Sequence, residues 1–147
     1  MIDPKEILYR EGRRASLDLQ ERAPDMTGTE LIAEEIDVPA WDAQKDYTGW
    51  KAGCPAADEG QVWILLIPHN AAHYTGRPSG IRSLWGLAHT TDPALAKPWV
   101  APYGTSGVYL AGECCRYEDR VWRNRYEGNE YPPMTPNAED RWEEVAV

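Results

Sequence analysis

The run Gln61-Val62-Trp63-Ile64-Leu65-Leu66-Ile67 carries the strongest strand signal in the sequence, and its first three residues have a counterpart in Arg120-Val121-Trp122. The run is apolar without alternation, which predicts a strand that is buried on both faces. Such burial is explained if the strand packs against a second module or against the N-terminal segment. The two Val-Trp stretches lie 59 residues apart (122 − 63), and this offset organises much of the remaining chain.

Two further pairs of tryptophans repeat with nearly the same offset. Trp41 precedes Trp99 by 58 residues, and Trp85 precedes Trp142 by 57. A glycine lies ten residues before each central tryptophan and an asparagine lies seven residues after it; these are Gly53, Gly112, Asn70 and Asn129. A fixed period of this kind indicates an internal repeat. We therefore infer two copies of one unit, module one (residues 39–92) and module two (residues 93–147).

Residues 1–38 have a different character and predict helices. Asp3-Pro4-Lys5-Glu6 offers an N-cap, a proline in the first turn and an early acid, and Thr27 with Glu30 forms a capping box. These signals predict helices over 4–22 and 28–36. The first helix has only a ragged apolar stripe, formed by Ile7, Leu8, Leu17 and Leu19. Because a short helix of this kind is marginal alone, we expect the segment to serve in attachment or oligomerisation.

The fold class expected from these patterns is α+β, mainly β. Arg116–Glu118 and Arg120–Trp122 flank a tight turn and predict a hairpin. Twelve glycines and twelve prolines indicate short strands and many turns. We expect a short helical segment followed by two small, Trp-rich, three-stranded modules. Because units of roughly 45–50 residues bury little surface alone, the modules should dock against each other or the helices.

Composition excludes several classes of partner. The net charge is −9, from 24 acidic and 15 basic residues, which argues against nucleic acid as a ligand. No apolar run approaches the roughly 18 residues that a membrane span requires, and the N-terminus lacks the apolar core of a signal peptide. Three cysteines, two of them adjacent, do not form a disulfide framework. We expect a soluble protein that is made in the cytoplasm with reduced thiols.

The residue order in module two resembles the small chitinase-type carbohydrate-binding modules. The matching residues are Trp99, Tyr109-Leu110-Ala111-Gly112-Glu113, Tyr117-Glu118-Asp119-Arg120-Val121-Trp122, Asn129 and Trp142-Glu143-Glu144-Val145. Tandem copies behind a short acidic helical segment are similar to small tail proteins of phages and prophages. The resemblance covers about residues 39–147, and Gly53-Cys54 and Cys114-Cys115 depart from the family pattern. It implies a virion tail location, other tail proteins and host cell-wall polysaccharide as partners, and a homo-oligomer.

The aromatic residues divide into two groups. Six tryptophans that recur in both modules are expected to form the core, because large aromatics supply most of the burial available to a small domain: Trp41, Trp63, Trp85, Trp99, Trp122 and Trp142. Their alternative role is as stacking platforms for sugars. Aromatics outside the repeat pattern are the better candidates for carbohydrate binding: Trp50, Tyr74, Tyr126 and Tyr131. For these four, the alternatives are ordinary exposed aromatics or subunit contacts.

No pattern indicates catalysis, a metal or a cofactor. His69 and His73 have helical i, i+4 spacing, but they lack a third ligand and the glutamate of the zincin pattern. Acidic pairs such as Glu118-Asp119 fall in predicted turns, where carboxylates are usually solvated. Cys114 and Cys115 would need a paired histidine to act as nucleophiles, and all three histidines lie in module one. We therefore expect a non-enzymatic protein without catalytic residues, metal or cofactor.

The leading hypothesis is a structural and binding component of a phage tail tip or baseplate. The helical segment would attach or oligomerise the chain, and the two modules would present aromatic surface to the host wall or to other tail proteins. One alternative is a purely structural assembly protein that does not bind sugar. Another is the accessory carbohydrate-binding subunit of a chitinase or cell-wall hydrolase.

Overall fold

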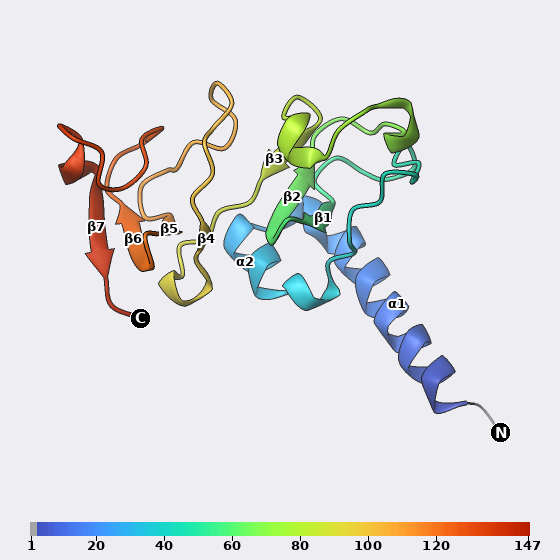
Figure 1. Cartoon of the computed structure of the whole chain (residues 1–147). Helices are drawn as coiled ribbons and strands as arrows, with labels where there is room; N and C mark the ends of the chain where they lie inside the picture. The colour runs from blue at the N-terminus through green and yellow to red at the C-terminus, as the bar shows by residue number, and fades with distance from the viewer. Residues whose placement is uncertain (1–2) are drawn as a thin grey trace.

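The first helix begins and ends at the predicted residues. The computed structural model describes residues 3–147, in which helix α1 runs Pro4–Arg22. Asp3 caps it, its Oδ1 accepting a hydrogen bond from the backbone N–H of Lys5 at 3.0 Å. Leu19 is fully buried, whereas the first turns of α1 extend away from the rest of the molecule (Figure 1). The side chain of Leu8, part of the predicted stripe, lies outside the described residues.

The second helix is shorter than the predicted span 28–36. Helix α2 runs Gly28–Ala33 and carries the predicted capping box between Thr27 and Glu30. A tight 3₁₀ turn follows over Glu35–Asp37. Ile36, the last residue of the predicted span, is 95% exposed, because this turn brings Val38 into the helical core instead. Pro39 favours the extended conformation of Val38, since a proline disfavours helical conformation in the residue before it.

Two separate sheets follow the helices, and the expected mixed α+β class is confirmed. The first sheet is antiparallel and contains β1 (Pro55–Asp58), β2 (Gln61–Leu65) and β3 (Trp85–Leu87). The second contains β4 (Lys97–Pro98), β5 (Cys114–Tyr117), β6 (Arg120–Asn124) and β7 (Trp142–Val145). Only β4, which pairs with β5, is parallel to its neighbour. This two-residue strand makes the second sheet four-stranded rather than three-stranded.

The two sheets share strand registers at the offsets found in the sequence. Leu65 pairs with Trp85 in the first sheet, and Asn124 pairs with Trp142 in the second. The central tryptophans make equivalent hydrogen bonds, because Trp63 Nε1 donates to the Asp58 carbonyl at 3.1 Å and Trp122 Nε1 donates to the Tyr117 carbonyl at 3.1 Å. The glycines also match: Gly53 N–H donates to Leu65 O, and Gly112 N–H donates to Asn124 O, both at 2.8 Å. The same backbone frame therefore occurs in both modules.

The predicted hairpin in module two is confirmed and has a counterpart in module one. Glu118 and Asp119 connect β5 to β6 with φ values of 52° and 59°. Glu59 and Gly60 connect β1 to β2 with φ values of 52° and 75°. Two central residues with positive φ define the type I′ turn, which suits the twist of a two-residue hairpin.

Strand β2 is buried on both faces, as its apolar run predicts. Trp63 and Leu65 join the module-one core with Tyr47 and Trp85. Val62 instead packs into the helical core, with Leu19, Ala23, Leu31, Ile32, Val38 and Ala88. The helices therefore cover one face of the first sheet. Leu66 and Ile67 lie beyond the end of the strand and are 42% and 53% exposed.

The modules dock through a short junction. The N–H of Cys114 donates to the Thr90 carbonyl at 2.8 Å, which links the second sheet to the end of module one. His89 stacks on Tyr109, with ring centroids 3.8 Å apart, and its Nε2 lies 2.8 Å from the Gly107 carbonyl oxygen. Arg82 Nη1 donates to the Ala101 carbonyl at 3.0 Å. These contacts fix module two against module one.

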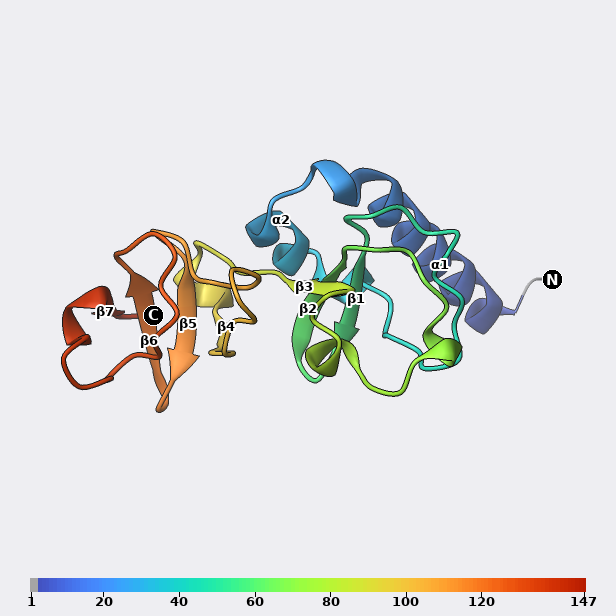
Figure 2. The same ribbon diagram turned by 90° about the horizontal axis from the view of Figure 1, so that it is seen from above.

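The chain is elongated, with the free part of α1 at one end and module two at the other. Both views show this arrangement (Figures 1 and 2). We call residues 3–14, all of whose described side chains are exposed, the arm. Among the described residues, no helix combines the length and apolar character needed to cross a bilayer.

Candidate functional site

The six repeat tryptophans are distributed between core and core edge. Trp63, Trp85 and Trp142 are 1%, 1% and 4% exposed. Trp41, Trp99 and Trp122 are half-buried and pack against the core clusters. The indole N–H groups of Trp41 and Trp99 are buried without a hydrogen-bond partner among the described residues. All six contribute to packing, so the exposed aromatics are the surfaces left for a ligand.

The two module-one candidates lie around Tyr47. The half-buried Trp50 packs edge-on against Tyr47, with ring centroids 4.7 Å apart, and Lys45 Nζ lies 5.6 Å from the Trp50 ring centroid. Tyr74 is 47% exposed and meets His69 edge-on at 5.3 Å. Trp50 therefore belongs partly to the core, whereas Tyr74 stands at the surface.

The two module-two candidates, Tyr126 and Tyr131, are brought together by Arg141. The Arg141 guanidinium carbon lies 4.8 Å from the Tyr126 ring centroid and 5.1 Å from that of Tyr131. The two tyrosines are 38% and 40% exposed. The Tyr126 hydroxyl donates to Asp140 Oδ2 at 2.5 Å. We call Tyr126, Tyr131, Asp140 and Arg141 the tyrosine platform.

Two buried asparagines hold the platform in place. Asn124 Nδ2 donates to the carbonyl oxygens of Tyr109 and Tyr126, and Asn124 Oδ1 accepts the Tyr126 N–H at 3.1 Å. Asn129 Nδ2 donates to Asn124 Oδ1 at 2.9 Å, and Asn129 Oδ1 accepts the Tyr131 N–H at 3.0 Å. Both asparagines are at most 1% exposed. Each platform tyrosine is thus fixed through its backbone by a polar core.

Sequence reasoning missed Asn124 and Arg141. A signal for Asn124 was present, because the 59-residue offset makes it the equivalent of Leu65, an apolar core residue of module one. A buried amide at such a position must satisfy its hydrogen bonds, which indicates a structural or positioning role. Arg141 gave no comparable signal, since its contact with two tyrosines depends on how the loops fold back on each other.

The electrostatics of the platform favour a polyhydroxylated ligand. The hydrogen bond to the Asp140 carboxylate raises the pKa of Tyr126, and the same bond lowers the pKa of Asp140. At neutral pH the tyrosine therefore donates and the carboxylate accepts. Among the described residues, no carboxylate pairs with the Arg141 guanidinium. The platform offers two aromatic faces, free guanidinium donors and a carboxylate acceptor side by side.

Module one has no such platform at the matching positions. The bond from Leu66 N–H to Leu84 O matches that from Arg125 N–H to Arg141 O, so Leu84 corresponds to Arg141. Ile67 and Ala72 correspond in the same way to Tyr126 and Tyr131, because Asn70 Oδ1 accepts the Ala72 N–H. The three module-one residues carry no aromatic ring and no charge.

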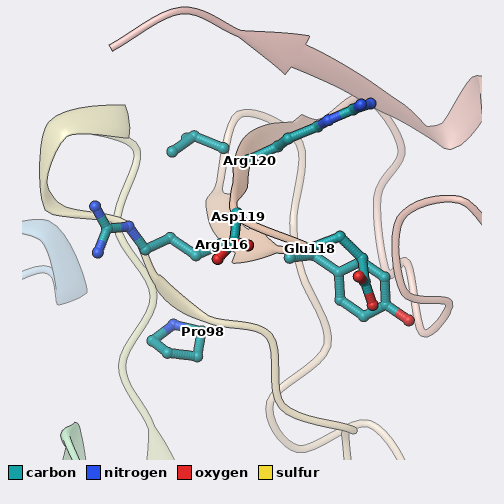
Figure 3. A pocket seen from close by; sticks show the side chains of 7 residues that line it. Pro98, Arg116, Glu118, Asp119 and Arg120 are labelled. Atoms are coloured by element: carbon teal, nitrogen blue, oxygen red, sulfur yellow. The ribbon is translucent and has the colours of Figure 1, made fainter.

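A second feature of module two is an open hollow of about 460 Å³ at the β5–β6 hairpin. Figure 3 shows the side chains that line it. The lining residues are Pro98, Arg116, Tyr117, Glu118, Asp119, Arg120 and Val121. We call this feature the hairpin hollow, and it is distinct from the tyrosine platform.

The histidines and cysteines form no recognisable reactive centre. His69 Nδ1 lies 2.7 Å from the Ile67 carbonyl, a local loop contact. Among the described residues, no group of three or more potential ligands could hold a metal ion. Cys54, Cys114 and Cys115 are free and buried, and burial raises the pKa of each thiol. The thiols therefore stay protonated at neutral pH.

Comparison with known proteins gives a partial similarity. The chain is similar to a sialidase from Clostridium perfringens, with 24% identity over 112 residues that cover 76% of this chain and 29% of the sialidase. The chain thus spans less than a third of the length of that relative. No protein-family model matches the sequence.

Proposed function

We propose that the protein is a non-enzymatic carbohydrate-binding component that uses module two to bind a glycan. The observation that carries this proposal is the tyrosine platform, where Tyr126 and Tyr131 flank the unpaired guanidinium of Arg141. Sugar rings present apolar C–H faces that stack on aromatic rings and hydroxyl groups that need donors and acceptors. The platform supplies both from one rigid surface.

Rigidity supports binding because little side-chain freedom is lost when the ligand docks. The Asn124–Asn129 pair fixes the backbone of both tyrosines, and Asp140 holds the Tyr126 hydroxyl. A preorganised site avoids part of the ordering cost of association. The similarity to a protein named a sialidase is compatible with a carbohydrate-related role.

We further propose that this binding serves a phage or prophage tail, at its tip or baseplate, with host cell-wall glycan as the ligand. The support for this setting is the resemblance of the tandem modules to small tail proteins. Many copies held together would raise a weak single-site affinity through avidity. A purely structural assembly role and an accessory role beside a chitinase or wall hydrolase remain the alternatives to be tested.

The test is binding of the full chain to insoluble chitin and to purified cell-wall polysaccharides. Replacing Tyr126 or Tyr131 by alanine should weaken retention roughly tenfold, about 1.4 kcal/mol, because one stacking face is lost. Tyr126→Phe keeps the ring and should retain most of the affinity. Tyr103→Ala is the matched control, since Tyr103 is a module-two tyrosine that is 64% exposed outside the platform.

Equal retention of the platform variants and the control would refute the carbohydrate site. Failure of every glycan to retain the unaltered protein would favour the structural assembly role. Detection of the protein in purified tail particles, by labelling and negative-stain imaging, tests the virion setting separately from sugar binding.

A further inference from the structure

The guanidinium of Arg141 is held in place by aromatic rings, and its hydrogen-bond donors remain unused. Its carbon atom lies 4.8 Å from the Tyr126 ring centroid and 5.1 Å from that of Tyr131. Among the described residues, no carbonyl or carboxylate oxygen accepts a hydrogen bond from it, and none of its nitrogens is both buried and unpaired. The guanidinium N–H groups are therefore positioned by the two rings and open to solvent.

The acid beside this guanidinium already has a partner. Asp140 Oδ2 accepts the Tyr126 hydroxyl at 2.5 Å, and this hydrogen bond is the main cause of the lowered pKa of Asp140. The positive charges of Arg141 and Arg125 lower the Asp140 pKa further, so both arginines lie near the platform. The platform thus has two positive charges for one negative charge, in a chain whose net charge is −9.

The shared frame of the two modules does not require this pair of arginines. In module two the Arg125 N–H donates to the Arg141 carbonyl at 2.8 Å. In module one the equivalent bond runs from the Leu66 N–H to the Leu84 carbonyl at 2.9 Å. The same backbone positions therefore hold two leucines in one module and two arginines in the other. The positive charge is a feature of module two alone.

The free donors of Arg141 suit an anionic group of one particular shape. The N–H groups of a guanidinium lie in its own plane and form a fork that matches the two oxygens of a carboxylate. A hydrogen bond to a charged acceptor is roughly twice as strong as a bond between neutral groups, so a sugar hydroxyl gains less from the same donors. The rings on which Arg141 stacks lie where the sugar ring bearing the carboxylate would rest.

We infer that the tyrosine platform prefers a sugar that carries a carboxylate, which Arg141 binds through two parallel hydrogen bonds while Tyr126 and Tyr131 contact the sugar ring. This inference rests on the proposed glycan site and names the class of glycan that the site selects. The carboxylate can belong to a hexuronic acid or to the lactyl ether of a muramic acid. The recognition is the same in both cases.

The experiment is a titration of the isotope-labelled full chain with two matched pairs of sugars, followed by NMR at physiological ionic strength. The pairs are trigalacturonate against its methyl ester, and N-acetylmuramic acid against N-acetylglucosamine. We expect at least one acid to bind roughly tenfold more tightly than its neutral partner. The shifts should centre on the amides of Tyr126 and Tyr131 and on the Arg141 side chain. The pair that shows the preference identifies the source of the carboxylate.

Variants of Arg141 test the origin of the preference. Arg141→Gln should abolish the preference for the acid, and Arg141→Lys should restore only part of it, because an ammonium group cannot form the two parallel bonds. Arg116→Gln is the matched control. It removes the same charge from an exposed β5 position outside the platform and should leave the preference unchanged. The amide spectrum of each variant checks that it is folded.

Equal affinity for the acid and the neutral member of both pairs would overturn this inference and leave the glycan site in place. A preference that Arg141→Gln does not reduce would also overturn it, as would an equal reduction in Arg116→Gln. Absence of binding by both acids would have the same meaning. The proposed function is judged separately, by whether Tyr126→Ala and Tyr131→Ala weaken the binding of neutral glycans.

Discussion

Module one and module two share a hydrogen-bonded frame but fill it differently. The core of module one contains eight buried residues, including Trp63, Leu65 and Trp85, and the helices cover a further face. The core of module two contains three, Tyr109, Cys115 and Trp142, beside the buried Asn124 and Asn129. An apolar core supports stability, whereas a polar core fixes backbone groups in specific positions. The comparison indicates that module one anchors the fold, and module two carries the tyrosine platform that we propose as the glycan site.

The largest expected effect is on stability, and it should differ between the cores of the two modules. Trp85→Ala should cost about 4 kcal/mol of unfolding free energy, because a large cavity opens among well-packed neighbours. Trp142→Ala, at the equivalent position, should cost about 3 kcal/mol, since fewer buried side chains surround it. Urea unfolding followed by circular dichroism measures both. A greater loss for Trp142→Ala would contradict the assignment of module one as the anchor.

The junction between the modules should be sensitive to acid through His89. Burial lowers the pKa of His89 from 6.5 to about 4, and the nearby Arg82 charge acts in the same direction. The unfolded chain therefore takes up the proton first, and stability present above pH 6.5 is lost as the pH falls towards 4. The unfolding free energy should decrease by about 3 kcal/mol over this range of pH.

Unfolding free energies at pH 7 and pH 4.5 check this prediction. His89→Gln should show a smaller decrease than the unaltered protein, because the group that is protonated on unfolding is absent. His73→Gln, in an exposed turn of module one, is the matched control and should behave like the unaltered protein. An identical pH dependence in all three would exclude His89 as the source.

The polar core of module two should matter for both stability and binding. Asn124→Leu gives this position the residue type found at Leu65 in module one, but removes the acceptor of the Tyr126 N–H and of the buried Asn129 Nδ2. We expect a loss of about 2 kcal/mol. Glycan retention should fall as well, because Tyr126 is no longer held. Unchanged retention in a folded Asn124→Leu variant would show that the platform does not need the asparagine pair.

The smallest expected effect on stability concerns Arg77, which lies over the β1–β2 hairpin of module one. Arg77→Gln removes the ion pair between Arg77 and Asp58 at the β1–β2 hairpin. Because the Arg77 side chain is 60% exposed and solvent screens the ion pair, the loss of unfolding free energy should be smaller than for any of the variants above. Urea unfolding at low and high salt measures it. A loss of several kcal/mol of unfolding free energy would mean that Arg77 contributes to the module-one core.

Local signals predicted the parts of the fold that depend on neighbouring residues. The Asp3-Pro4 start and the capping box at Thr27 located both helices, and the tryptophan offsets located equivalent strands. The end of α2 was missed at Ile36, because the position of Val38 in the helical core decides where the chain turns. Tertiary contacts of this kind override local helix preference.

The candidate site was only partly predictable for the same reason. Tyr126 and Tyr131 were identified as aromatics outside the repeat pattern. The same criterion selected Trp50 and Tyr74, so the sequence did not distinguish the two pairs. What distinguishes the first pair is Arg141, which reaches them from a different loop. The hairpin hollow was also unforeseen, because its lining includes Pro98 of β4, and no local signal indicates that β4 lies beside the β5–β6 hairpin.

The three buried thiols have a consequence for where the chain can work. Oxidation and disulfide exchange begin from an accessible thiolate, and burial keeps Cys54, Cys114 and Cys115 protonated and shielded. A change from a reducing to an oxidising environment therefore leaves the folded chain without new cross-links. The covalent structure of the folded chain should therefore be the same in both environments.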